Sequence, residues 1–202
     1  MSKALRIFDI VTIGLIVIAG LLVGSYFLGT KHCKKVAVDF TCNDNSDNTE
    51  TKYKFLGSDV SDYICDLSSQ LELDPDLVVA ILMVENPEFN KDVAHKNENG
   101  TIDVGLFQLN DKYLWSTFKR NYWFSNIELD PFNWKHNTYI AIHHIKFLQT
   151  KMKITDEVIM AYNCGEGAVM NGTVPDSTYV YLAKVKNNIW LLKNCEKERS
   201  AQ

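Results

Sequence analysis

The chain has 202 residues and a formal net charge of −4, with 46% apolar and 23% charged residues. This length allows one ordinary domain with an appendage, and the composition is that of a globular rather than a disordered protein. Phosphate binding needs clustered lysine and arginine, so the lack of a basic block argues against a nucleic-acid partner.

The N-terminus carries an apolar run at residues 10–28, flanked by basic residues on both sides. A helix of that length spans about 28 Å, close to one hydrocarbon core. No Ala-x-Ala-like site follows, which favours an uncleaved anchor over a signal peptide. We therefore predict a single-pass transmembrane anchor at residues 1–30. Because both flanks are basic, the charge pattern does not decide its orientation.

The remaining sequence divides into a polar tether (31–57), a globular domain (58–195) and a tail (196–202). Residues 59–71 have apolar positions at helical spacing. Asp74 and Pro75 begin a second helix that ends near residue 86, before Pro87. Turn formers dominate 88–111, with room for a strand pair around 101–109. Further helices are expected at 137–149, 155–162 and 177–192.

These elements predict a mainly α domain of roughly 135 residues with one small β-hairpin, large enough to bury a core. The five cysteines contain no Cys-x-x-Cys pair, which argues against a zinc site. Outside the cytoplasm they would form one or two disulfides, whose pairing the sequence leaves open. They are Cys33, Cys42, Cys65, Cys164 and Cys195.

Glu85 lies near the C-terminal end of the second helix, on the same face as Val78, Ile81 and Leu82. Burial on that apolar face and the negative end of the helix would both raise the carboxyl pKa. A carboxyl that stays protonated near neutral pH is what a general acid for glycoside cleavage requires. Many such glutamates instead tilt outward or meet an arginine, so this residue needs support from other motifs.

A Gly-x-x-Gln turn follows at residues 105–108. Gly105 allows a positive φ or a close backbone approach. Phe107 offers a flat apolar surface for a sugar ring, and Gln108 both donates and accepts hydrogen bonds. The alternative is a strand with alternating burial and an incidental glutamine.

An Ala-Tyr-Asn corner ends the helix predicted at 155–162, which Thr155 would cap, and Gly165 is among the turn formers that follow. Tyr162 there would hydrogen-bond either the glutamate or a sugar. The alternative is a core tyrosine with its hydroxyl at the surface.

Together these segments resemble the signature of the lytic transglycosylase (SLT) family: Glu-Ser, Gly-Leu-Met-Gln and Ala-Tyr-Asn-Ala-Gly. The segment 130–132, followed by Asn137, and Tyr179-Val180 add further similarity, and the resemblance covers about residues 59–190. It implies an α+β, lysozyme-like fold. The sequence departs from the pattern in having Asn86 for Ser, Phe107 for Met and Cys164 for Ala.

The resemblance also implies roles. Glu85 would be the sole acid/base, cleaving the β-1,4 bond between N-acetylmuramic acid and N-acetylglucosamine in peptidoglycan and leaving 1,6-anhydro ends. Gln108 and Phe107 would bind substrate, Tyr162 would orient Glu85, and Asn163, also a candidate for substrate contact, would brace the loop. No metal or cofactor is implied.

The expected partners are glycan strands and the membrane, with the catalytic domain facing the periplasm or cell wall. The sequence does not distinguish general wall turnover from opening the wall locally for a secretion apparatus or a phage particle. One alternative is a muramidase similar to goose-type lysozyme, which would activate water with Asp103 or Glu98. Another is an inactive wall-binding assembly protein. The adjacent His143 and His144 point about 100° apart on a helix, so we interpret them as a solvated face rather than a metal site.

Overall fold

The computed structural model describes residues 52–120 and 129–200. The predicted anchor, most of the tether, and Cys33, Cys42 and the side chain of Cys195 lie outside the described residues. Among the helices within the two ranges, none has the length and apolar character needed to cross a membrane. The anchor and the boundaries between the predicted parts therefore stay predictions.

Two helices predicted from the sequence open the domain, after a short 3-10 turn η3 (Lys54–Leu56). They are α2 (Ser58–Gln70) and α3 (Pro75–Glu85), which pack against each other. Asp74 caps α3 as expected, because its side chain accepts from the Asp76 backbone N–H at 2.9 Å.

The sequence predicted one buried apolar face on this helix, but α3 is buried on every side. No side chain from residue 77 to residue 82 is more than 3% exposed. The helix therefore runs through the interior, and its last residue, Glu85, is only partly buried.

The predicted strand pair is confirmed and proves to be a three-stranded antiparallel sheet in the order β1-β2-β3. Its strands are β1 (Ala94–Lys96), β2 (Ile102–Val104) and β3 (Leu109–Asn110). Val104 pairs with Leu109, so residues 105–108 form the turn between β2 and β3. The Gly-x-x-Gln segment is thus a turn rather than a strand.

A one-turn π-helix, η4 (Asp111–Trp115), leads directly into α4 (Ser116–Arg120). Helix α5 (Trp134–Lys151) begins earlier than predicted, because the Asn133 side chain accepts from the backbone N–H groups of Lys135 and His136. Three further helices complete the described chain: α6 (Thr155–Cys164), α7 (Glu166–Met170) and α8 (Asp176–Ser200).

Thr155 begins α6 as predicted but does not cap it. The N-cap residue is Ile154, which has no side-chain oxygen, and no side-chain cap bond forms. The Glu157 carboxylate instead accepts from the Lys153 backbone N–H at 3.0 Å. An acidic group in the first turn also suits the positive end of the helix.

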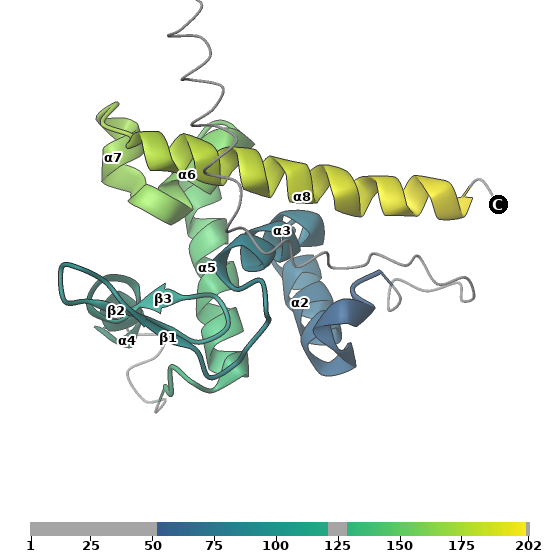
Figure 1. Ribbon diagram of the computed structural model, residues 1–202, viewed down its shortest axis with the longest axis horizontal. Helices are drawn as coiled ribbons and strands as arrows, with labels where there is room; N and C mark the ends of the chain where they lie inside the picture. Colours follow the sequence, from purple (N-terminus) through teal and green to yellow (C-terminus); the bar gives the residue numbers. More distant parts are fainter. Residues whose placement is uncertain (1–51, 121–128, 201–202) are drawn as a thin grey trace, which may run out of the picture. The chain divides into compact units, whose positions relative to one another are not determined.

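Helix α5 runs between α2 and α3 on one side and the sheet with α4 on the other, while α8 lies along α3 and α6 (Figure 1). Asn137 of α5 donates to the Val104 carbonyl at 2.9 Å and so joins the helical part to the sheet. The C-terminal end of α3 faces this junction, because Asn86, just after it, donates to the Leu106 carbonyl in the β2–β3 turn. The arrangement places Glu85 where the helices meet the sheet.

Candidate active site

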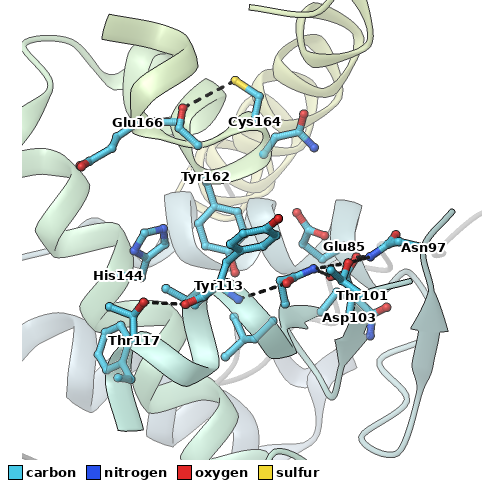
Figure 2. A pocket seen from close by; sticks show the side chains of 18 of the residues that line it. Glu85, Asn97, Thr101, Asp103, Tyr113, Thr117, His144, Tyr162, Cys164 and Glu166 are labelled. Atoms are coloured by element: carbon cyan, nitrogen blue, oxygen red, sulfur yellow. Dashed lines mark hydrogen bonds between the residues drawn. The ribbon is translucent and has the colours of Figure 1, made fainter. Parts of the chain in front are cut away.

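A cleft of about 830 Å³ opens at this junction. Glu85 lines it together with residues of the sheet, of η4 and α4, of α5 and α6, and of the corner after α6 (Figure 2). Three of the predicted site residues line it together with Glu85: Gln108, Tyr162 and Asn163. Segments that are far apart in sequence are therefore brought to one site.

Glu85 has the electrostatic properties of a general acid. Its pKa is raised to about 7: burial raises it most, the hydrogen bond from Tyr181 lowers it, and the negative charge of Asp103 raises it. The Tyr181 hydroxyl donates to Glu85 Oε1 at 2.6 Å. The other oxygen, Oε2, is then the one that can carry the proton into the cleft.

Tyr181 is the functional candidate that sequence reasoning missed. It lies on α8 and is 8% exposed, whereas Tyr179, which carried part of the family resemblance, is 54% exposed. The sequence signal that could have found it is the helical spacing of Thr178, Tyr181 and Val185. The structure shows that all three are buried. That spacing marks the buried face of α8, on which Tyr181 supplies a phenol.

Tyr162 lies in the cleft but does not orient Glu85 through a hydrogen bond, which corrects one of its two predicted roles. Its hydroxyl donates to the Phe107 carbonyl at 3.3 Å. Burial, followed by the charge of Glu85, raises its pKa well above the usual range. Tyr162 is therefore a neutral phenol close to Glu85, tied to the β2–β3 turn.

The β2–β3 turn depends on Gly105 and Asn137. Gly105 has φ +71°, and a Cβ there would lie 2.4 Å from Asn137 Nδ2 and 2.6 Å from the Pro131 carbonyl oxygen. Asn137 Oδ1 accepts from the Phe107 backbone N–H at 2.7 Å. Only glycine fits this close approach, and the sequence predicted that Gly105 would allow a positive φ or a close backbone approach.

Phe107 is not a sugar-binding surface. Its side chain is 0% exposed and belongs to the hydrophobic core. Within the turn, residue 107 points inward and residue 108 lines the cleft. The prediction that its ring packs against a sugar was therefore wrong.

Gln108 lines the cleft in an unusual backbone conformation, with φ +49°. Its side-chain Nε2 donates to the Gly105 carbonyl at 2.8 Å. Within the described residues its Oε1 accepts no hydrogen bond, so the side chain can accept from a ligand.

Asn86 and Asn163 both brace the site. Asn86, which replaces the serine of the family pattern, is buried and donates to the carbonyls of Asn90 at 2.7 Å and Leu106 at 3.2 Å. Asn163 Oδ1 accepts from Thr178 Oγ1 at 2.8 Å, which ties the end of α6 to the start of α8.

The sheet contributes a second carboxylate to the cleft. Asp103 lines it, and Figure 2 shows its side chain below Glu85. Glu98, the other carboxylate considered from the sequence, is exposed and is not among the lining residues. Of the two carboxylates that the sequence offered for activating water in a muramidase, only Asp103 lines the cleft.

His144 corrects the interpretation of the histidine pair as a solvated face. It lines the cleft 5.8 Å from the Tyr162 ring, and burial lowers its pKa to about 4. His143 packs against Tyr139, with the rings 4.2 Å apart. In the part of the chain that the structure describes, no three His, Cys, Asp or Glu side chains gather as metal ligands.

Cys164 stands at the rim of the cleft as a free thiol, and Cys65 is also free. These two cysteines of the described residues therefore do not form a disulfide with each other.

Comparison with protein families finds a match over the helical domain. The model described as "Transglycosylase SLT domain" matches residues 62–177. That span includes Glu85, the Gly-x-x-Gln turn and the Ala-Tyr-Asn corner, and it ends before Tyr181. No curated protein matched the chain significantly.

Proposed function

This chain belongs to the transglycosylase SLT domain family, and on that premise we propose that it is a membrane-anchored lytic transglycosylase. Its domain is of the peptidoglycan transglycosylase type. The proposed reaction cleaves the β-1,4 bond between N-acetylmuramic acid and N-acetylglucosamine and leaves a 1,6-anhydro ring.

The observation that carries this proposal is the environment of Glu85. Its pKa of about 7 lies near the pH at which the reaction would run, so the group can both give and take a proton. Tyr181 occupies Oε1 and leaves Oε2 to face the scissile bond. A fixed carboxyl of this kind suits a mechanism in which one group acts first as acid and then as base.

In the proposed reaction Glu85 acts first as the acid and then as the base. The Glu85 proton passes to the glycosidic oxygen, and the bond to the anomeric carbon breaks with its electron pair leaving on that oxygen. The C6 hydroxyl oxygen of the muramic sugar then attacks the anomeric carbon, and its proton passes to the Glu85 carboxylate. The acid is regenerated and no water is consumed.

Substrate binding falls to the other lining residues. Gln108 Oε1 is available to accept from a sugar hydroxyl or an acetamido N–H, because its Nε2 is engaged by the turn. Tyr162 presents a half-buried phenol in the same cleft. Asn163 serves as a brace through Thr178, and Phe107 has no direct part.

The proposed setting uses the N-terminal segments. Residues 10–28 would hold the protein in the membrane, and the polar tether would let the domain reach glycan strands on the periplasmic or wall side. Such an anchored enzyme suits wall remodelling or local wall opening for a secretion or phage assembly.

Hydrolysis is the second candidate, and the observation that favours it is Asp103 in the cleft. In a two-carboxylate glycosidase, the second group either activates water or stabilises the sugar cation. The two reactions differ by one water in the product: hydrolysis leaves reducing ends, whereas transglycosylation leaves anhydro ends.

The experiment compares the full-length protein in detergent with its Glu85→Gln variant on purified peptidoglycan. Mass spectrometry of the released sugars should show anhydro ends from the wild type and no product from the variant. Glu98→Gln is the matched control, because it removes the same charge outside the cleft and should act like wild type. Equal release of sugars by wild type and Glu85→Gln would refute the catalytic proposal. A wild-type protein that binds peptidoglycan but releases no sugars would point to the wall-binding alternative.

A further inference from the structure

The cleft is lined by two chemically different groups of side chains. The sheet and the loop between β1 and β2 contribute polar groups such as Asn97, Asn99 and Asp103, whereas η4 and α5 contribute the aromatic residues Tyr113 and Phe147. A sugar ring has both kinds of surface, with hydroxyl groups around its edge and C–H groups on its faces. A cleft that combines apolar surface with a few polar groups is suited to such a ligand.

Tyr113 and Phe147 leave more of their rings uncovered than the other aromatic residues of the cleft. Tyr113 is 67% exposed and Phe147 is 44% exposed, whereas Phe118 and Tyr162 are half-buried. Apolar surface that stays in contact with water gains free energy when a ligand covers it. These two rings are therefore the aromatic surfaces that the cleft offers to a sugar, the part that the sequence assigned to Phe107.

The backbone of Tyr113 is held in place while its side chain is exposed. Its N–H donates to Asn110 Oδ1 at 3.3 Å, and its carbonyl accepts from Thr117 Oγ1 at 2.6 Å. Within the described residues its phenol hydroxyl makes no hydrogen bond, so it is available to a sugar hydroxyl. The residue lies in η4, and short π-helices of this kind are frequent at functional sites. A ring presented from a fixed backbone binds with a smaller entropy cost.

Phe147 lies at the outer end of an aromatic row that leads away from Glu85. Burial, followed by the charge of Glu85, raises the pKa of Tyr162, which forms the inner end of the row. The Tyr162 ring lies 5.8 Å from His144, and the His144 ring lies 6.3 Å from Phe147 with an angle of 18° between the two planes. Phe147 is thus separated from Tyr162 by a further ring.

The aromatic row is uncharged near neutral pH. Burial lowers the pKa of His144 to about 4, so its ring is neutral there. Lys151 Nζ lies 5.4 Å from the centre of the Phe147 ring and places a hydrogen-bond donor beside it. An uncharged, flat surface with a donor at its side fits a neutral sugar of the glycan strand better than the charged stem peptide.

We propose that Tyr113 and Phe147 form an outer subsite that binds a sugar ring of the glycan strand away from the bond that Glu85 cleaves, so that cleavage depends on the length of the strand. The inference rests on the proposed function, because its ligand is a glycan strand that passes Glu85. Both residues line the same cleft as Glu85, and Figure 2 shows Tyr113 there with His144 and Tyr162. They act on strand binding and not on the proton transfers at Glu85.

The first test measures kcat and KM of full-length Tyr113→Ala and Phe147→Ala on peptidoglycan. We expect KM to rise about tenfold in each variant while kcat stays within about twofold, because the lost contact binds ground state and transition state alike. Both side chains are exposed, so their removal should leave the melting temperature nearly unchanged. Wild-type KM in both variants would overturn the proposal.

Matched controls exist for both substitutions. Tyr179 is 54% exposed and Phe132 is 42% exposed, and neither lines the cleft. Tyr179→Ala and Phe132→Ala remove the same side chains at similar exposure, so they should leave KM as in wild type. A rise in KM in these controls equal to that in the cleft variants would show that the effect is not local to the cleft.

The dependence on strand length separates a subsite from a general disturbance. Glycan strands freed of stem peptides are sorted by length, and kcat/KM is measured on each fraction. Wild type should prefer long strands, and the two cleft variants should lose that preference while matching wild type on the shortest fragment that is cleaved. An equal loss at every length would overturn the proposal.

Conservative variants test whether the flat ring is the group that binds. Tyr113→Phe and Phe147→Tyr keep a ring and should keep KM within about threefold of wild type. Tyr113→Leu and Phe147→Leu keep apolar surface without a flat face and should raise KM nearly as much as alanine. Leucine variants with wild-type KM would refute stacking against a sugar.

Binding to the Glu85→Gln protein makes the two proposals fail in different ways. In that background, calorimetric titration with long peptide-free strands should show binding about tenfold weaker after Tyr113→Ala or Phe147→Ala. Unchanged binding, with anhydro sugars still released by wild type, removes the outer subsite and leaves the transglycosylase function intact. Equal sugar release by wild type and Glu85→Gln removes the catalytic proposal, whatever the two aromatic variants do.

Discussion

Replacing Glu85 with glutamine should abolish activity and, at the same time, stabilise the folded protein above pH 7. Burial raises the pKa of this carboxyl from 4.5 to about 7. The folded state therefore holds the proton more tightly than the unfolded state. Stability from this group is fully present below pH 4.5 and is lost as the pH rises through 7.

The magnitude follows from that shift. A rise of about 2.5 units, at about 1.36 kcal/mol per unit, makes the ionised Glu85 cost up to about 3 kcal/mol of unfolding free energy above pH 7. Glutamine has nearly the same shape, still accepts the Tyr181 hydrogen bond and carries no charge. The variant should therefore match wild type at about pH 4 and be more stable by up to about 3 kcal/mol at about pH 8, or roughly 6–12 °C in melting temperature.

Urea unfolding of both proteins from about pH 4 to about pH 8 measures this difference directly. Glu98→Gln serves as the control, because a substitution at an exposed site should change the unfolding free energy by less than about 0.5 kcal/mol at each pH. A Glu85→Gln variant whose stability difference from wild type is the same at both ends of this range would show that Glu85 is well solvated. The general-acid argument would then fail.

Three further changes test other parts of the site. Tyr181→Phe removes a hydrogen bond that favours ionised Glu85, so the alkaline limb of kcat/KM should move to higher pH, and a shift to lower pH would contradict the assignment. Gly105→Ala forces a Cβ to within 2.4 Å of Asn137 Nδ2 and should cost at least about 2 kcal/mol in urea unfolding, whereas an unchanged midpoint would disprove the close approach. Phe107→Leu should cost about 1–2 kcal/mol of stability and leave KM within about twofold, and a large rise in KM would restore Phe107 to the substrate site.

Local signals in the sequence located most of the helices. Asp74 with Pro75 marked the start of α3, and Pro87 marked its end, because caps and ring constraints act within a few residues. The start of α5 was missed, because its cap, Asn133, precedes the apolar periodicity. Short helix α7 was missed as well, since a single turn following a glycine has little pattern to read.

The resemblance of the three motifs to the SLT signature predicted that Glu85, Gln108 and Tyr162 belong to one site, and all three line the cleft. The roles of individual side chains were less predictable. An apolar residue in a turn, such as Phe107, can face a ligand or the core with the same sequence pattern. The packing of the β2–β3 turn against the core decided that the ring points inward.

The sequence by itself determined that a glutamate ends an apolar helix and that a glycine-dependent turn and a tyrosine corner accompany it, because periodicity, caps and turn chemistry are local properties. Only the tertiary structure decided that Tyr181 contacts Glu85 from 96 residues away and that Asp103 faces the same cleft. Those contacts depend on how α8 and the sheet pack against α3. Helical spacing can mark the buried face of α8 that carries Tyr181, but it does not say which element that face packs against. The raised pKa of Glu85 could therefore be expected from the sequence, whereas the contacts that control it could not.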